Sequence, residues 1–367
     1  MPLLCWAVFG FGQLCFVRER RRPVPSNKDT RILTSKIKNA QTAGELLDVV
    51  DGIVDRPVFD HIHAAAAYTK LGNLQKNHPL GTKEAKSDVL IRLENRLQGM
   101  LVRKEVGAQG LANIIWAAAS LYSDIPAVLK IVPALVKEIP LKAHDMNPQQ
   151  LSNSLWAAAQ LQDAACDVLN IVPAIVFEIS LEPRKMNPQD LSNNLFAAAQ
   201  LKDAAPGVLE VVPALVEQIP LKAGGMIPQH LSNSLWALKD FPDASHGVPQ
   251  AVEALVEEIL KKIGGMKGQD LSNTVEALVF LEESFPIDRK PDTIAASAAQ
   301  LNLVLSGLKG KDLMFTVPVM VWACVKSNVY NADLLAAVAQ RFSSQRALWP
   351  LPDWGLCALH LGIGHGA

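Results

Sequence analysis

The sequence has few cysteines, and none stands where a metal centre or a disulfide framework would need it. The five cysteines lie far apart and form neither a CxxC pair nor another metal-ligand spacing. They are Cys5, Cys15, Cys166, Cys324 and Cys357. This distribution predicts reduced thiols in a reducing compartment. Cys166 is expected to be a packing residue.

Motifs for catalysis are also absent. The chain contains no GxxxxGK[ST], HExxH or GxSxG sequence. His61 and His63 form an HxH, but no further histidine, cysteine or acidic cluster recurs in step with it, so a zinc site is not indicated. We therefore expect no catalytic residues, no metal and no cofactor, and we rank an enzyme below a binding protein.

Charge is scarce and unevenly distributed. Charged residues make up 19% of the chain and hydrophobic residues 49%, which excludes global disorder. The net charge of −1 conceals +6 over residues 1–106, −9 over residues 107–286 and +2 over residues 287–367. The acidic centre argues against a partner held there mainly through phosphates.

The composition of the first residues resembles that of a targeting segment more than that of a folded domain. Residues 1–17 are apolar, and RERRR follows at 18–22. An apolar run of this length is at the short limit for crossing a membrane. The segment that continues to about Lys38 is rich in Arg and Lys and poor in acids, as transit peptides are. We expect residues 1–38 to be a targeting segment; a short membrane anchor or a misassigned gene start are the alternatives.

What the chain does have is a repeat of forty residues. The unit Asn147–Met186 matches the unit Asn187–Met226 at 24 of 40 positions. A fixed period of this length predicts stacked supersecondary units rather than a closed globule. Leucine, glutamine and asparagine recur most regularly, at Leu111, Leu151, Leu191, Leu231 and Leu271, at Gln109, Gln149, Gln189, Gln229 and Gln269, and at Asn113, Asn153, Asn193, Asn233 and Asn273.

Each unit is predicted to be a helix–turn–helix. Asn147 suits an N-cap, Pro148 the first helical position, and Gln150 the capping-box position, and the helix should end near residues 162–163. A second apolar segment contains Pro173, which recurs as Pro133 and Pro213 and, slightly displaced, as Pro249. Because a proline deep in a helix costs about 3 kcal/mol, the second helix should begin or kink there. The fold class expected is an all-α solenoid.

The repeats divide the chain into four parts. Residues 1–38 are the targeting segment or anchor, 39–106 degenerate helical repeats, 107–286 the regular repeats, and 287–367 diverged repeats. Residues 84–106 resemble an amphipathic helix, and segments 313–327 and 353–361 resemble diverged first helices. The last residues stop where a helix should complete, which suggests truncation or a missing downstream domain.

Helical projection predicts a polar stripe on the first helix of each unit. Leu151, Leu155 and the alanines at 158–159 fall on one side, whereas Gln149, Asn153 and Gln160 fall on the other. Neighbouring helices about 10 Å apart would align these stripes into a ladder. The candidate ligand-binding residues are Gln109, Asn113, Trp116, Gln149, Asn153, Trp156, Gln160, Gln189, Asn193, Phe196, Gln200, Gln229, Asn233, Trp236, Gln269 and Asn273.

The chemistry of the ladder suits two ligands. Asn and Gln side chains donate and accept at once, so they fit peptide backbones and nucleobase edges alike. The aromatic side chains could stack on bases. Each type also has a structural interpretation, in which Asn153 bonds to the next repeat, Gln149 satisfies amides at the helix start, and Trp156 fills the core between repeats.

The motif NPQxLSNxLWAAAQL, at 147–161, at 187–201 with Phe196 for Trp, and more weakly at 227–238, resembles the first-helix signature of organellar helical-repeat proteins. These are the octotricopeptide and heptatricopeptide repeats, including those found with FAST-kinase-like and RAP domains. The resemblance covers residues 107–281 well and 40–361 loosely. It implies an RNA-binding solenoid acting in mitochondrial or plastid RNA maturation, stability or translation. No RAP domain is recognisable, so a cleavage role is not implied.

Two functions are therefore carried forward. The first is non-catalytic binding of single-stranded RNA in an organelle, the mitochondrion or the plastid. The second is an armadillo- or HEAT-like scaffold, cytoplasmic or organellar, that binds an extended or basic peptide or protein. Stable DNA binding is not expected, and membrane contact only if residues 1–17 act as an anchor. A ladder inside a groove bordered by basic residues favours RNA, and an acidic groove favours a peptide.

Overall fold

The computed structural model describes residues 27–77 and 88–343, and across these ranges every regular element is a helix. The described helices form eight consecutive pairs, each packed against the next, so the fold is an all-α solenoid as predicted. The predicted segments within residues 1–26 and 353–361 lie outside the described residues. Within the described ranges, no helix is both long and apolar enough to cross a membrane.

The first and second helices of the pairs form two separate rows. The first helices stack on one another, and they are α1 (Asn27–Asn39), α3 (His61–Asn77), α6 (Ala108–Leu121), α8 (Pro148–Leu161), α10 (Pro188–Leu201), α13 (Pro228–Leu238), α15 (Gly268–Leu281) and α17 (Gly310–Lys326). The second helices lie behind them, and they are α2 (Ala43–Asp51), α5 (Asp88–Val102), α7 (Val132–Lys142), α9 (Val172–Leu181), α11 (Val212–Val216) with α12 (Ile219–Lys222), α14 (Val248–Lys262), α16 (Lys290–Val304) and α18 (Ala332–Ser343).

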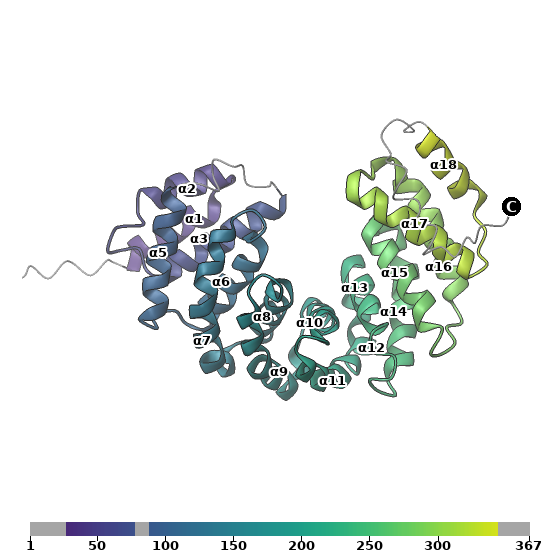
Figure 1. The fold of residues 1–367 in the computed structure, drawn as a ribbon, viewed down its shortest axis with the longest axis horizontal. Helices are drawn as coiled ribbons and strands as arrows, with labels where there is room; N and C mark the ends of the chain where they lie inside the picture. Colours follow the sequence, from purple (N-terminus) through teal and green to yellow (C-terminus); the bar gives the residue numbers. More distant parts are fainter. Residues whose placement is uncertain (1–26, 78–87, 344–367) are drawn as a thin grey trace, which may run out of the picture.

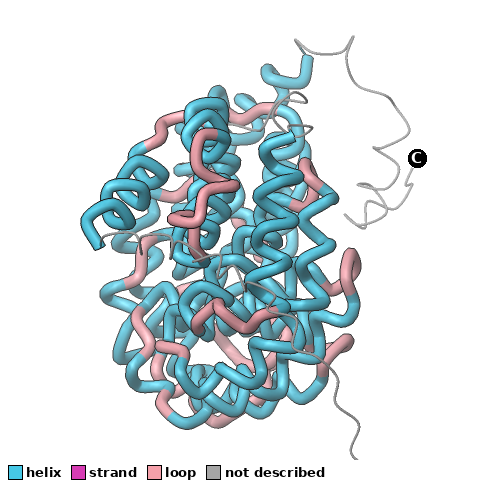
Figure 2. Tube along the Cα trace, turned by 90° about the vertical axis from the view of Figure 1, so that its left-hand side faces the viewer, coloured by secondary structure: helices cyan, strands magenta, loops and turns pink. Residues whose placement is uncertain are grey.

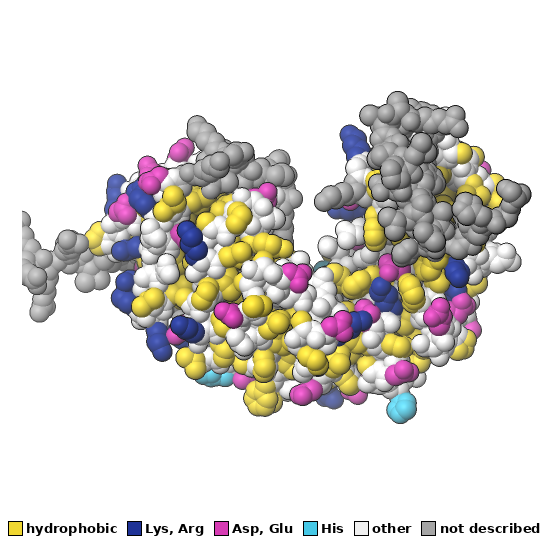
Figure 3. All heavy atoms as spheres, in the orientation of Figure 1, with side chains coloured by type: hydrophobic (Ala, Val, Ile, Leu, Met, Phe, Trp, Pro, Cys, Tyr) yellow, Lys and Arg dark blue, Asp and Glu magenta, His cyan; other side chains and the backbone are white. Residues whose placement is uncertain are grey.

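The stack curves into an arc whose two ends face each other across an opening. Helices α6, α8, α10, α13 and α15 lie on the inner side of the arc, and α7, α9, α11, α12 and α14 lie on the outer side (Figure 1). The perpendicular view shows helices joined by loops throughout the described residues (Figure 2). The space-filling view shows the hollow between the two ends (Figure 3). The first helices therefore provide the inner surface.

Local capping sets the start of the first helices. The Asn147 side chain accepts a hydrogen bond from the backbone N–H of Gln150 (N···Oδ1 3.0 Å), and the Gln150 side chain accepts one from the N–H of Asn147 (3.2 Å). Asn187 and Asp190 repeat this reciprocal pattern one unit later. Capping of this kind satisfies amides that the helix leaves free. The predicted capping box and the end of α8 at Leu161 are both confirmed.

Prolines set the start of the second helices. Pro173 lies in the first turn of α9, and Pro133, Pro213 and Pro249 lie in the first turns of α7, α11 and α14. The first turn tolerates proline because its N–H groups have no partner within the helix. The prediction that the second helix begins at the proline is confirmed. The apolar residues just before it form a separate 3₁₀ helix, Cys166–Ile171 in the second regular unit.

The start of that 3₁₀ helix overturns one expectation. Cys166 is exposed and is a free thiol, so its assignment as a packing residue is wrong. The turn after α8 brings the first residue of the 3₁₀ helix to the surface, and Val168 and Ile171 supply the buried contacts instead.

Burial of the first helices is wider than the projection predicts. Leu151, Leu155 and the alanines at 158–159 are buried as expected, but Ser152 and Ser154 are fully buried as well. Ser152 Oγ donates to the backbone carbonyl of Asp190 in the next unit (3.3 Å), and Ser192 Oγ repeats this bond to His230 O (3.0 Å). A first helix packs against a neighbour on each side, so only one stripe remains exposed.

Lysines near the ends of the second helices donate hydrogen bonds to the backbone of the preceding unit. Lys142 donates to the carbonyl of Val106 at 2.8 Å and Lys262 to that of Met226 at 2.9 Å, each reaching into the preceding unit. Lys222 occupies the equivalent position and donates to the carbonyl of Met186. These lysines serve to join neighbouring units.

The first described helix belongs to the fold. Helix α1 packs on α3, with Ile37 fully buried, and the carbonyl of Thr30 is 3.0 Å from Nε2 of His63. His63 is itself fully buried and its Nδ1 lies 2.7 Å from Oδ1 of Asp60, so it is a core histidine. The solenoid therefore includes residues 27–38, within the segment that the sequence assigned to targeting.

The diverged parts at both ends also form helix pairs. Helix α5 occupies most of segment 84–106, and α17, stacked on α15, contains all but the last residue of the diverged first helix expected at 313–327. The non-helical connection between the regular and the diverged repeats covers residues 282–289, and α16 then carries Pro291 in its first turn.

Candidate ligand-binding surface

The exposed stripe of the first helices faces the opening of the arc. Each regular first helix is covered by a neighbouring first helix on two sides and by its second helix on a third, and the remaining side lies along the inner face (Figure 1). Ten amide residues occupy this side, and we call them the inner amide row. They are Gln109, Asn113, Gln149, Asn153, Gln189, Asn193, Gln229, Asn233, Gln269 and Asn273.

The glutamine side chains of the inner amide row are exposed and do not join one described helix to another. Gln109, Gln149, Gln189, Gln229 and Gln269 all lie in the first turn of their helices. None of their side-chain amides makes a hydrogen bond to another described residue. The interpretation in which Gln149 satisfies the amides of the helix start does not hold, because Asn147 and Gln150 do so. These five amides are available to a ligand.

The asparagines divide into two groups. Asn113, Asn153 and Asn193 are half-buried, and their side-chain amides form no hydrogen bond among the described residues. Asn273 is only 7% exposed and donates to Oδ1 of Asn233 across the repeat boundary (3.4 Å). The structural interpretation therefore applies to the last two asparagines, and the first three remain available on the inner face.

The second half of each stripe is joined across repeats. Gln160 Nε2 donates to Oε1 of Gln200 at 2.8 Å. The ring centroids of Phe196 and Trp236 are 5.2 Å apart with their planes tilted by 39°. The structure thus brings these candidate residues together in pairs, each pair linking one first helix to the next.

The tryptophans are half-buried between the repeats and the inner face. Trp116 packs against α3, where a Cβ at Gly72 would come within 3.1 Å of its ring, so glycine there makes room for the indole. Trp156 and Trp236 also pack on the core and stay partly exposed. Lys239 Nζ lies 4.4 Å from the centroid of the Trp236 ring, a cation–π contact.

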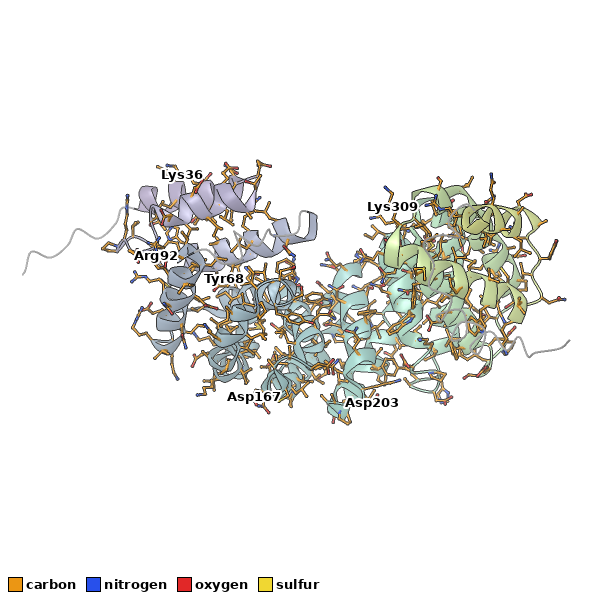
Figure 4. The ribbon with its side chains drawn as sticks, turned by 45° about the horizontal axis from the view of Figure 1, so that its top comes forward. Lys36, Tyr68, Arg92, Asp167, Asp203 and Lys309 are labelled. Carbon is orange, nitrogen blue, oxygen red and sulfur yellow. The ribbon has the colours of Figure 1, made fainter. Side chains whose placement is uncertain are left out.

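Charge is separated between the two faces. Helices α6, α8 and α13 carry no Asp, Glu, Lys or Arg, and the carboxylates in α10 and α15 are Asp190 and Asp270, both buried, and Glu276. Asp167 and Asp203 lie on the outer edge, whereas Lys36 lies on α1 at one end of the arc and Lys309 lies at the other end, beside the opening (Figure 4). The acidity of residues 107–286 therefore does not belong to the inner face.

The two carboxylates that do reach the stripe are paired with lysines from the preceding unit. Lys202 Nζ is 2.5 Å from Oδ1 of Asp240, and Lys239 Nζ is 2.7 Å from Oε1 of Glu276. The inner face is therefore close to neutral along its centre, so the condition that would favour a basic peptide is not met.

The pKa values of one side chain near the start of α10 and one near the start of α13 differ from their ordinary values. Burial raises the pKa of Asp190, and the N–H of Asn187 and the charge of Lys222 oppose this shift. Burial lowers the pKa of His230, whose Nδ1 is buried without a hydrogen-bond partner among the described residues. Both occupy the capping-box position, so their effects concern stability. No group of three or more His, Cys, Asp or Glu side chains in the described ranges could hold a metal ion.

An open groove of about 670 Å³ lies at the first end of the inner amide row, between α1, α3 and the start of α6. Gln109 and Asn113 line it together with Lys38, Lys70 and His61. Sequence patterns do not single out the two lysines, because they stand outside the forty-residue repeat and meet only when α1 packs on α3.

No protein-family model matches the chain, and no curated protein matches it either. A solved chain described as a "Circular tandem repeat protein with novel repeat topology and enhanced subunit contact surfaces" is 10% identical, with a TM-score of 0.30, over 85% of this chain and 93% of that chain. The packing of the helices defines the class: this protein is a helical tandem-repeat scaffold.

Proposed function

We propose that this protein binds single-stranded RNA along its inner face and acts without catalysis in organellar RNA processing, stability or translation. The observation that carries the proposal is the inner amide row. Eight of its ten side-chain amides have no hydrogen-bond partner among the described residues, and they belong to the helices that form the nearly uncharged inner side of the arc (Figure 1).

The chemistry of this surface suits bases better than phosphates. A side-chain amide can form two complementary hydrogen bonds with a base edge. Helical-repeat proteins that read single strands use a few side chains per repeat for this purpose. Half-buried Trp156, beside Asn153, offers a partly exposed ring on which a base can stack.

The charge distribution supports RNA over a basic peptide. Asp190 and Asp270 in the first helices are buried, and Asp240 and Glu276 on the stripe are paired with lysines, whereas Asp167 and Asp203 lie on the outer edge (Figure 4). Lys309 lies beside the opening (Figure 4). A strand of RNA could therefore pass along the inner face without meeting unpaired negative charge, and Lys309 could contact its phosphates.

The proposal can be tested by fluorescence anisotropy with labelled single-stranded RNA of mixed sequence, and with double-stranded RNA and single-stranded DNA as competitors. A variant carrying Gln149→Ala, Asn153→Ala, Gln189→Ala and Asn193→Ala should bind single-stranded RNA at least roughly tenfold more weakly, about 1.4 kcal/mol. The matched control is Asn170→Ala, an exposed amide in the outer-row 3₁₀ helix before α9.

Equal affinity of the quadruple variant and the control would refute reading by the amide row. Absence of RNA binding by the unaltered protein, together with capture of an extended peptide that the quadruple variant no longer captures, would establish the scaffold alternative. Imaging of the full-length chain fused to a fluorescent protein tests the organellar part of the proposal, since a diffuse cytoplasmic signal would contradict it.

A further inference from the structure

The groove at the first end of the inner amide row is built differently from the rest of the inner face. Helix α1 covers one side of it through Thr34 and Lys38, and α3 forms its floor with Ala66 and Thr69. Gly107 and the first residues of α6 complete the lining. Three separate elements therefore converge on one concave site, whereas the centre of the inner face is built from one row of helices.

Cationic side chains converge on this groove. Lys38 is exposed and Lys70 is half-buried, and neither forms an ion pair with another described residue. His61 lines the same groove. The carboxylate of Glu105, which interacts electrostatically with His61, is paired with Arg103 (Nε···Oε1 2.6 Å). Among the described residues that line it, the groove consequently presents two ammonium groups without an ion pair and no carboxylate.

The start of α6 adds backbone donors to the same place. In α8 and α10 the N-cap asparagines, Asn147 and Asn187, accept hydrogen bonds from the first amides of the helix. In α6 the N-cap is Gly107, no side chain caps the helix, and the first turn holds no acidic residue. A Cβ at residue 107 would meet nothing within 4 Å, so packing does not require glycine there. The amides of residues 108–110 are left to a ligand.

We infer that this groove binds a phosphate group, and that in the RNA complex it holds a phosphodiester of the strand whose bases continue onto Gln109 and Asn113. The second clause rests on the proposed function. Two ammonium groups and uncapped helix amides are the donors that phosphate requires. Because Gln109 and Asn113 line the same groove, a held phosphate would set the position of the strand at the first pair of the inner amide row.

The first test removes the ammonium groups. The double variant Lys38→Ala/Lys70→Ala is compared with Lys130→Ala/Lys137→Ala, which removes two exposed lysines of the second row that do not line the groove. RNA affinity should fall at least roughly tenfold in the first variant only. The plot of log affinity against log salt concentration should become shallower by about 0.7 for each phosphate that the protein no longer neutralises. Equal affinities and equal slopes for the two variants would overturn the inference and leave the proposed function intact.

The second test uses the missing cap. Gly107→Asp and Gly107→Asn both supply an N-cap side chain in a backbone conformation that accepts it (φ −77°, ψ 171°). Both should raise the thermal midpoint. Gly107→Asp also places a negative charge in the groove and should weaken RNA binding at least roughly tenfold relative to Gly107→Asn. If the two variants bound RNA equally well, the start of α6 would not contact a phosphate.

The third test needs no RNA. Inorganic pyrophosphate should raise the thermal midpoint of the unaltered protein and not that of Lys38→Ala/Lys70→Ala. If the protein binds no RNA, the proposed function fails, and this shift still decides whether the groove is a phosphate site. No shift in the unaltered protein would overturn the inference.

Discussion

The side-chain amide of Gln160 donates a hydrogen bond to the side-chain carbonyl of Gln200, forty residues further along the chain (Nε2···Oε1 2.8 Å). Gln162 on the neighbouring turn donates to the backbone carbonyl of the same Gln200 (3.3 Å). Two glutamines of one unit thus converge on one glutamine of the next. Residues that the sequence placed in a ligand ladder are here partners of one another.

The Gln160–Gln200 bond should appear as a coupling energy. In a cycle of Gln160→Ala, Gln200→Ala and the double variant, the sum of the two single effects should exceed the effect of the double variant by about 0.5–1.5 kcal/mol, the net contribution of a typical hydrogen bond. Urea unfolding followed by circular dichroism measures it. Strict additivity would show that the bond contributes nothing to stability.

The aromatic pair at the next boundary should contribute more. Trp236→Ala removes a ring that packs on Phe196 and lies beneath the Lys239 ammonium, whereas Trp236→Phe keeps an aromatic ring at the boundary. We expect the alanine variant to be destabilised by about 2–4 kcal/mol, because it removes both the aromatic packing and the cation–π interaction, and the phenylalanine variant by about half as much. Thermal unfolding of the two variants gives the comparison, and equal destabilisation would contradict a specific role for the ring.

Alanine substitutions at a capping position and at an exposed position of the same helical turn should affect stability differently. Asn187→Ala removes the side chain that accepts from the N–H groups of Gln189 and Asp190, and should cost about 1 kcal/mol. Gln189→Ala should change stability by less than about 0.5 kcal/mol, because its side chain is exposed and makes no hydrogen bond to a described residue. Urea midpoints of both variants test this, and a large effect of Gln189→Ala would assign that residue to the fold.

Lowering the pH should reduce the free energy of unfolding, and His230 should account for part of this loss. Burial lowers the pKa of His230 in the folded state. As the pH falls through about 6.5, the unfolded chain takes up a proton that the folded chain binds less readily, so stability falls. Glutamine stands at the equivalent position of α8, and His230→Gln should remove this part of the loss. The measurement is the urea midpoint at about pH 7.5 and about pH 5.5, on either side of the ordinary histidine pKa. Equal losses in both proteins would contradict the assignment.

Much of the fold follows from the sequence because its signals are local. Asn147, Pro148 and Gln150 set the start of α8 within four residues, and Pro173 sets the start of α9. The forty-residue period then dictates that identical units stack. Local signals do not predict the burial of Ser152. A helical projection assumes that a helix packs on one neighbour, whereas each first helix packs on a neighbouring first helix on both sides.

The inner surface was predictable only in part. The position of the glutamines follows from the helical period, since Gln149 must oppose Leu151 and Leu155. Which asparagines remain available depends on contacts between units, and Asn233 and Asn273 differ from Asn153 only through such a contact. The groove depends on α1 packing against α3, which no pattern within the repeat encodes.

The exposed glutamines also bear on how such an array can evolve. The side chains of Gln149 and Gln189 make no hydrogen bond to a described residue. A substitution at either position can therefore alter what the surface binds while leaving the folded state as stable as before. Gln160 lacks this freedom, since its replacement leaves Gln200 without its partner and so calls for a second change. Divergence of recognition should therefore proceed fastest in the first turn of each inner helix and slowest where the stripe is joined across repeats.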